Sequence, residues 1–349
     1  MRLERAKELI ETKDFRKGLR RLDKMAQEGD AEAQYLMGDI YLTGRQVPLN
    51  PRQAVFWLRK AAENGQPDAI FKIGILYHSG FQLDQEAGNN ILSVALEQGE
   101  PDYAKALDCA LRAAELGQAD AMALVAHILT HGPEEMRDIP RARQFYEKSA
   151  SLESVHGLQG YALALLEAAA SEDDRPKAVG LLEKAAGMGS GQAYYLLGLL
   201  NEEEGHEAQS FQFFTQAAEK EITPAQMKLG VAYYQGRGVD RDLVKAETWL
   251  RKAALSGDAE AAALVGDINL QGDGRSPNFI EAANWYRRAV EGGHVAATVT
   301  LGQLTYNGAG TPKNVQEAEA LFALAASKGS EPAAQLLKLL QAEKQSKAS

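Results

Sequence analysis

The sequence predicts an all-α protein, a right-handed α-α superhelical solenoid of stacked helix-turn-helix repeats that is nearly all helix and has no strands. Three observations predict it: a small residue recurs mostly every 36 residues, large apolar residues recur at one place in the second half of each unit, and most units end on glycine. A period of about 20 to 50 residues indicates units that each bury an apolar face against their neighbours.

The small residue lies in the middle of the first predicted helix of each unit, at successive spacings of 36, 52, 36, 36, 32, 36 and 36 residues. Positions five before, one before and three after it are mostly apolar or small, as in Ala33, Met37 and Tyr41, and they share one helix stripe. We expect two helix backbones to approach closely at this residue. We call these residues the anchors: Gly38, Gly74, Ala126, Ala162, Gly198, Gly230, Gly266 and Gly302.

The second half of each unit is predicted to be another helix, as in AVFWLRKAAENG, AETWLRKAALSG and AANWYRRAVEGG. Asn50 precedes Pro51, and Asn278 and Asn314 are each followed three residues later by glutamate, which is typical of helix N-termini. The closing glycine suits a left-handed C-cap. Each unit is therefore a helix, a turn and a second helix.

All three tryptophans, Trp57, Trp249 and Trp285, lie eight residues before the end of their unit. We interpret this as a core position. In the other units it holds Cys109, Phe145, Leu181, Phe213 and Leu321. Cys109 is the single cysteine, so no intrachain disulfide forms, and we expect it to be a buried, inert thiol.

The segment AQMKLGVAYYQGRGVDRDLVKAETWLRKAALSG resembles the Sel-like repeat (SLR), a relative of the tetratricopeptide repeat. The resemblance covers residues 29–329, as eight units. It implies an α solenoid that acts as a non-enzymatic scaffold or adaptor for protein-protein interaction, with a partner held in the concave groove.

The predicted organisation is one array over residues 1–349. Residues 1–28 form an N-terminal helix pair, 29–329 form the eight repeats, and 330–349 form a C-terminal capping helix and tail. The second unit carries an insert within about residues 81–104, which is either an added helix or a loop. We consider this insert a candidate specificity element.

Composition limits the partners. The chain has 38 basic and 48 acidic residues and a net charge of −10, which disfavours nucleic acid and anionic membranes. No stretch approaches the roughly 18 apolar residues of a membrane span, so we expect no membrane insertion. We expect a cytoplasmic protein, or a periplasmic or secreted one if an export signal has been removed.

Two motifs could carry chemistry. The GRGV turn lacks the further glycines, the preceding strand or the Lys-Ser/Thr pair of a phosphate-binding loop, so we interpret it as the joint between two helices.

His127 and His131 have the spacing of two metal ligands on one helix face, with Glu134 and Glu135 close by, but no HExxH motif is present. We therefore expect no cofactor, no metal and no catalytic residue. The alternative is an enzyme or metal-binding protein with a site near the insert and His127/His131.

The candidate partner-binding residues lie three before, one after or four after an anchor, on the helix side opposite the core stripe. In tetratricopeptide relatives the matching positions commonly touch peptides. They could also pack against the next helix pair. We expect the partner segment to be apolar or amphipathic. The residues are Tyr35, Asp39, Phe71, Ile75, His78, His127, Tyr195, Leu199, Met227, Val231 and Tyr234.

Overall fold

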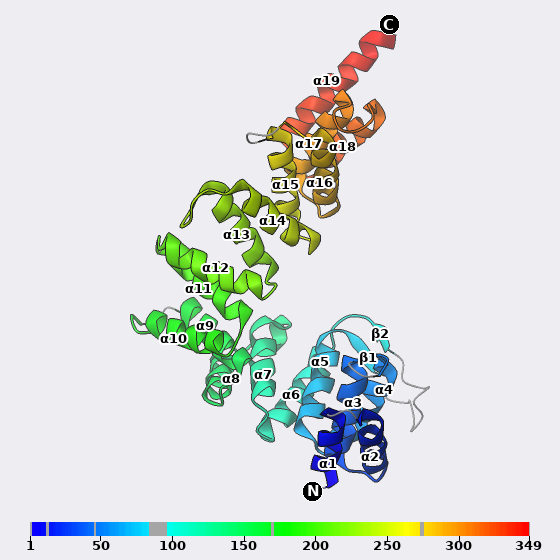
Figure 1. The fold of residues 1–349 in the computed structure, drawn as a ribbon, viewed down its shortest axis with the longest axis vertical. Helices are drawn as coiled ribbons and strands as arrows, with labels where there is room; N and C mark the ends of the chain where they lie inside the picture. Colours follow the sequence, from blue (N-terminus) through cyan, green and yellow to red (C-terminus); the bar gives the residue numbers. More distant parts are fainter. Residues whose placement is uncertain are drawn as a thin grey trace. The chain divides into compact units, whose positions relative to one another are not determined.

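The computed structural model describes residues 2–11, 14–44, 47–83, 96–168, 171–272 and 276–348. In these residues it has 19 α-helices, paired in consecutive repeats, which confirms the predicted all-α class (Figure 1). The helices are α1 (Arg2–Glu11), α2 (Phe15–Gln27), α3 (Ala31–Thr43), α4 (Pro51–Glu63), α5 (Pro67–His78), α6 (Tyr103–Glu115), α7 (Ala119–His131), α8 (Ile139–Ser151), α9 (Val155–Ala168), α10 (Asp174–Gly187), α11 (Gly191–Glu203), α12 (Glu207–Glu219), α13 (Thr223–Gln235), α14 (Leu243–Leu255), α15 (Ala259–Gln271), α16 (Phe279–Glu291), α17 (Val295–Asn307), α18 (Val315–Ser327) and α19 (Glu331–Ala348).

The chain divides into two compact units, residues 1–185 and 186–349, and the boundary falls within α10. In the first unit, α3 packs against α4, α5 against α6 and α7 against α8. In the second, α11 packs against α12, α13 against α14, α15 against α16 and α17 against α18. Within each unit, second helices also contact the first helix of the following pair, as α4 contacts α5 and α12 contacts α13, so neighbouring repeats of one unit share a core.

The predicted helix starts are confirmed. The side chain of Asn50 accepts a hydrogen bond from the backbone N–H of Gln53 at 3.1 Å, and Asn278 accepts one from Glu281 at 3.1 Å. Such caps satisfy backbone donors that the first helical turn leaves without an intrahelical partner. The same capping position therefore begins second helices in both compact units.

The anchors are all buried, as predicted. A Cβ added to Gly230 would lie 2.6 Å from Cγ of Leu250, and one added to Gly302 would lie 2.6 Å from Cε1 of Phe322. Real Cβ atoms do not come that close, so the second helix of the unit leaves no room for a side chain there. The small residue in the period of the sequence thus follows from a close contact between the two helices of a unit.

The assignment of the tryptophan position to the core is wrong for most units. Trp57 and Cys109 are buried, but Trp249 and Trp285 are half-buried. The residue that faces the anchor comes one position later, and Leu250 and Tyr286 are each 1% exposed. One step turns a helix by about 100°, which moves the indole from the helix interface to its edge.

At that edge the indoles meet basic side chains. The ammonium of Lys252 lies 4.0 Å from the centroid of the Trp249 ring, and the Arg251 guanidinium lies 5.1 Å from that of Trp285. A cation over the face of an indole is attracted by the ring electrons. Trp249 and Trp285 are therefore amphipathic edge residues that combine partial burial with a cation contact.

The GxG turn is a joint between repeats. Gly236 and Gly238 have φ values of 74° and 68°, which favour glycine. A Cβ on Gly238 would overlap the carbonyl oxygen of Glu207, at the N-terminus of α12. The turn therefore packs on the start of the second helix of the preceding repeat, which explains its second glycine without a phosphate.

The insert of the second unit contains two short strands, so the prediction of no strands is wrong. Strand β1 (Phe81–Leu83) pairs antiparallel with β2 (Leu96–Gln98), with Phe81 opposite Gln98. Such pairing joins segments distant in sequence, and strands this short carry no readable periodicity. Residues 84–95 lie outside the described residues, so the choice between an added helix and a loop stays a prediction.

Candidate functional site

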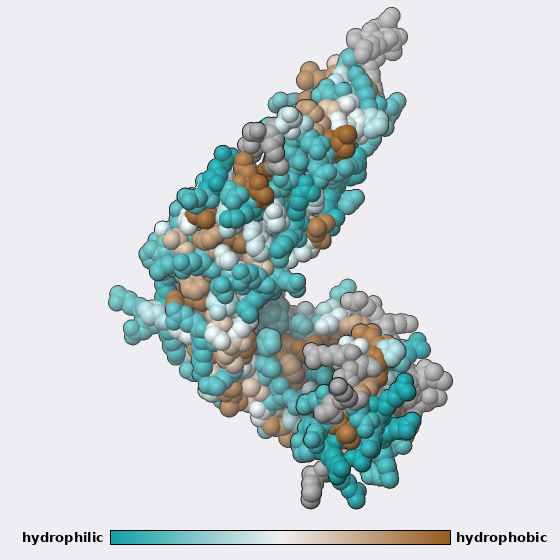
Figure 2. Space-filling model, viewed as in Figure 1, coloured by the Kyte–Doolittle hydropathy of each residue, from teal (hydrophilic) through white to brown (hydrophobic). Residues whose placement is uncertain are grey.

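The eleven predicted partner-binding residues all lie on first helices of pairs, on α3, α5 and α7 in the first unit and on α11 and α13 in the second. Ile75 is 37% exposed and the others are half-buried. Polar residues cover most of the face drawn in Figure 2, with apolar residues in small patches between them. We therefore describe the candidate residues of the two units separately.

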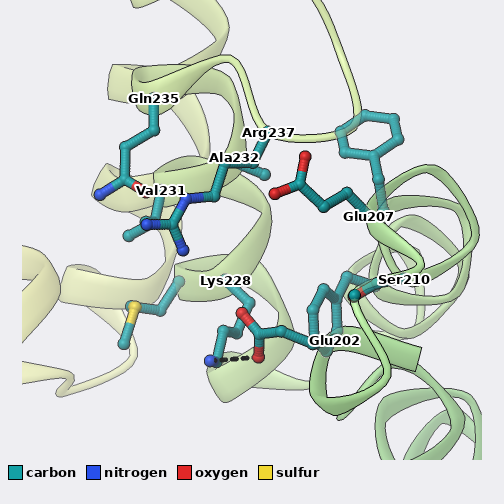
Figure 3. A pocket seen from close by; sticks show the side chains of 12 residues that line it. Glu202, Glu207, Ser210, Lys228, Val231, Ala232, Gln235 and Arg237 are labelled. Atoms are coloured by element: carbon teal, nitrogen blue, oxygen red, sulfur yellow. Dashed lines mark hydrogen bonds and ion pairs between the residues drawn. The ribbon is translucent and has the colours of Figure 1, made fainter. Parts of the chain in front are cut away.

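In the second unit, a pocket of about 250 Å³ lies between α11, α12 and α13 (Figure 3). Met227 and Val231, predicted from the repeat pattern, line it together with Phe211 and Phe214 of α12. Phe214 is 3% exposed and belongs to the core, while Met227 and Val231 keep partial access to solvent. The pocket therefore offers an apolar surface above a buried core residue.

Charged and polar groups border this pocket. The ammonium of Lys228 lies 2.6 Å from the Glu202 carboxylate and 6.0 Å from the centroid of the Phe214 ring. Figure 3 shows this ion pair at one end of the pocket and Gln235 and Arg237 at the other. An apolar surface bordered by both signs of charge suits an amphipathic ligand.

The other predicted residues of the second unit lie outside this pocket lining. Tyr195 and Leu199 pack against the buried cluster around Phe214, and Tyr234 packs against the cluster around Leu250. Met227 and Val231 pack against the cluster around Leu250 as well, so the alternative in which candidates pack against the next helix pair describes Met227, Val231 and Tyr234. Met227 and Val231 nevertheless keep partial access to solvent in the pocket.

Sequence reasoning missed the part of the pocket that comes from outside the first helices. Glu207, Ser210 and Phe211 belong to α12, and Arg237 belongs to the GxG turn. The aromatic run SFQFF in α12 was the available signal, since it holds more large aromatic residues than one core position requires.

In the first unit, Tyr35 and Asp39 are already engaged within the protein. The Lys72 ammonium pairs with the Asp39 carboxylate and lies 4.9 Å from the centroid of the Tyr35 ring. Burial raises the pKa of Tyr35. Burial also opposes the charge of Lys72, but the hydrogen bond to Asp39 and the negative charge of Asp39 raise the pKa of Lys72 overall. This group links α3 to α5.

The three histidines His78, His127 and His131 lie side by side. Ring centroids are 5.3 Å apart for His78 and His127, and 4.6 Å apart for His127 and His131. Burial lowers the pKa of His78, and burial followed by the charges of the other two histidines lowers that of His127. Across the described ranges, no group of three or more His, Cys, Asp or Glu side chains is placed to hold a metal ion. The geometry thus adds nothing to the metal-site alternative.

Cys109 is buried and its pKa is raised, first by burial and then by the charge of Asp108, as expected of an inert thiol. Among the described helices, none is both long and apolar enough to cross a bilayer.

Successive helix pairs with a buried small residue and a glycine turn between repeats define a solenoid protein of the tetratricopeptide-like class. The chain belongs to the Sel1 repeat family. The family model, described as Sel1 repeat, matches residues 31–66, 87–118, 119–154, 160–190, 223–258, 259–294 and 296–330. Sel1 repeats mediate protein interactions, and proteins built from them are generally non-catalytic scaffolds.

Among curated relatives, chitin synthase regulator SKT5 of Saccharomyces cerevisiae is 28% identical over 258 residues, which is 72% of this chain and 31% of the relative. The Sel1-repeat-containing protein YjcO of Escherichia coli is 34% identical over 157 residues, 44% of this chain and 56% of YjcO. DAP3-binding cell death enhancer 1 of Rattus norvegicus is 29% identical over 186 residues, 52% of this chain and 36% of the relative. The chain thus spans 31% to 56% of the length of these relatives.

Two solved structures are similar in fold. The Sel1 repeat protein from Oxalobacter formigenes is 25% identical, with a TM-score of 0.63, and the match covers 96% of this chain and 93% of that one. The protective antigen c5321 of uropathogenic Escherichia coli, which displays an SLR fold, is 26% identical with a TM-score of 0.65, over 91% of this chain and 66% of that one.

Proposed function

We propose that the chain is a non-enzymatic scaffold that holds an apolar or amphipathic segment of a partner protein in the α11–α13 pocket. The observation that carries the proposal is the meeting of Met227 and Val231 with Phe211 and Phe214 around one partly open apolar cavity. Apolar residues that stay accessible within such a concavity commonly mark an interaction site.

The dimensions and borders of the pocket support a peptide segment as the ligand. A cavity of about 250 Å³ accommodates one or two side chains of a longer segment. The Lys228–Glu202 pair and Arg237 can bind the polar groups on either side of those side chains. An amphipathic helix that inserts its apolar face into a groove meets these requirements.

The names of two relatives agree with action through another protein. One is a regulator of chitin synthase, and another is DAP3-binding. The net charge of −10 makes nucleic acid an unfavourable partner for this chain. A protein partner is thus the class that family and charge both favour.

The proposal is tested with Val231→Asp, in a capture experiment from a lysate of the source organism. A carboxylate in the apolar cavity should abolish recovery of the partner, because its desolvation costs about 1 to 3 kcal/mol or more without a hydrogen-bond partner. Ile75→Asp is the matched control, since Ile75 holds the same position after its anchor in the first unit and is 37% exposed.

Far-UV circular dichroism separates the outcomes. A folded Val231→Asp protein that still recovers the same partner would place the binding site elsewhere. An unfolded Val231→Asp protein would show that Val231 is a core residue. The proposal that Val231 binds the partner in the pocket would then be wrong.

A further inference from the structure

A second pocket, of about 590 Å³, lies within the first unit between α7, α8 and α9. It occupies the same place in the repeat as the α11–α13 pocket. Leu163 and Val231 each directly follow an anchor, and Tyr146 and Phe214 are the corresponding aromatic residues of α8 and α12. The first unit thus contains its own version of the pocket, with different side chains around it.

The lining of the α7–α9 pocket is apolar and open to solvent. Ile139 is 55% exposed and Leu163 is 40% exposed, while the ring of Tyr146 beneath them is only 7% exposed. A Cβ on Gly160 would overlap the Tyr146 ring, so the ring packs directly on the α9 backbone. Two accessible aliphatic side chains beside a firmly packed aromatic ring can accept an aliphatic side chain from a ligand.

The position of Gly160 holds lysine in two other repeats. Lys72 and Lys228 lie two residues before their anchors, and they pair with Asp39 and Glu202 of the preceding first helix. Glycine at this position supplies no side chain, so α9 provides no cation of its own there. The α7–α9 pocket therefore lacks the internal ammonium that borders the α11–α13 pocket.

A carboxylate without a donor lies at the border of the α7–α9 pocket. Glu167 corresponds to Glu343 of α19, which accepts a hydrogen bond of 2.7 Å from the hydroxyl of Tyr306. The residue of α7 that corresponds to Tyr306 is Thr130, and its hydroxyl donates to the carbonyl of Ala126. Within the part of the chain that the structure describes, no hydrogen bond or ion pair reaches Glu167.

The other charged groups around the pocket have partners. The Arg143 guanidinium lies 3.9 Å from the Asp174 carboxylate, and Glu147 accepts a hydrogen bond of 2.8 Å from the Tyr161 hydroxyl. Tyr146 and Glu167 line the same pocket, and burial, and next the charge of Glu167, raise the pKa of Tyr146 to about 12. Among the charged groups that line the pocket in the described residues, Glu167 is thus the one without a hydrogen bond or ion pair, and its charge is negative.

We propose that the α7–α9 pocket is a second docking site, and that it binds a partner segment carrying an aliphatic side chain with a lysine or arginine one helical turn away. The aliphatic side chain packs against Leu163, Ile139 and Tyr146, and the cation pairs with Glu167. This site belongs to the first unit and does not depend on the function proposed for the α11–α13 pocket.

The test uses two synthetic peptides of about 15 residues, long enough for marginal helicity in water. One carries Leu and Lys four residues apart, and the other has Glu in place of each Lys. Binding of each labelled peptide to the full chain is measured by fluorescence anisotropy at low salt. We expect the lysine peptide to bind about tenfold more tightly, since hydrogen bonds between charged groups are the strong ones.

Two variants locate the effect. Leu163→Asp should abolish binding of the lysine peptide, whereas Val231→Asp, at the corresponding position of the other pocket, should leave it unchanged. Equal affinity for the two peptides, or binding that survives Leu163→Asp, would overturn the proposal. Loss of binding in Val231→Asp would also overturn it, because the peptide would then occupy the α11–α13 pocket.

The charge-reversed variant Glu167→Lys keeps the proposal testable even if Leu163→Asp unfolds. Glu167 is exposed, so its substitution should leave the helices intact. We expect this variant to prefer the glutamate peptide over the lysine peptide. An unchanged preference would overturn the proposal.

Discussion

Leu250→Ala should destabilise the protein more than Trp249→Ala does, although tryptophan is much the larger side chain. Leu250 is 1% exposed and lies against the Gly230 anchor, whereas Trp249 is half-buried at the helix edge. The two positions are adjacent in α14, so helix propensity and distance from the ends of the array are nearly the same for both.

The magnitudes follow from burial. Removing three carbon atoms of Leu250 loses about 2.4 kcal/mol of transfer free energy at about 0.8 kcal/mol per carbon. The cavity left between α13 and α14 raises the cost to about 3 to 4 kcal/mol. Trp249→Ala leaves a space that water can enter, so its cost should be about 2 kcal/mol, the transfer term of roughly half of an aromatic side chain.

The free energy of unfolding is measured by urea denaturation followed by far-UV circular dichroism. Both variants are compared with the parent chain, and a common denaturant slope shows that the same segment unfolds. If Trp249→Ala cost more than Leu250→Ala by over about 1 kcal/mol, the indole would be the principal core contact, and the assignment of Leu250 to that role would be refuted.

Three further predictions concern the backbone and the histidines. Gly230→Ala should destabilise by about 1 to 3 kcal/mol through overpacking, whereas Gly180→Ala, where a Cβ meets nothing within 4 Å, should stabilise by up to about 1 kcal/mol; equal shifts in thermal melting would contradict the close approach at the anchor. Glu221 holds a left-handed φ of 61° where most units end on glycine, so Glu221→Gly should raise the melting temperature by an amount equivalent to about 1 kcal/mol, and a fall would show that no strain was present. Because burial lowers the folded-state pKa values of His78 and His127, the unfolded state binds protons more readily, and their contribution to stability is present above about pH 6.5 and is lost as the pH falls through the folded-state pKa values. Denaturation midpoints measured from about pH 7 to pH 5 should therefore fall less steeply in His127→Gln than in the parent chain, and identical slopes would refute this origin.

Local features of the sequence were sufficient for the helix pairs. The recurrence of small anchors such as Gly230 and the capping residues such as Asn278 predicted where helices begin and which positions approach closely, and both are confirmed. Caps and anchors can be predicted from the sequence because both depend on local geometry. A cap binds backbone donors only a few residues away, and the spacing of residues on one helix face is set by 3.6 residues per turn. The period of the array likewise follows from one contact that recurs in the units with a glycine anchor.

The candidate site was predictable only in part. Met227 and Val231 followed from their distance to the Gly230 anchor, but Phe211 and Arg237 did not, since they come from a neighbouring helix and a turn. Which of two adjacent apolar residues faces the core was also decided by rotation, as Trp249 and Leu250 show.

The tertiary structure alone decided what the repeat left open. A sequence period states which residues occupy equivalent positions, but equivalent positions have different neighbours in each unit. Glu343 meets the Tyr306 hydroxyl, whereas the corresponding Glu167 has Thr130 at that place, and this hydroxyl bonds to its own helix. Burial and pairing depend on contacts between elements about 30 to 40 residues apart, and the free energy of a polar group is set by those contacts rather than by its place in the repeat.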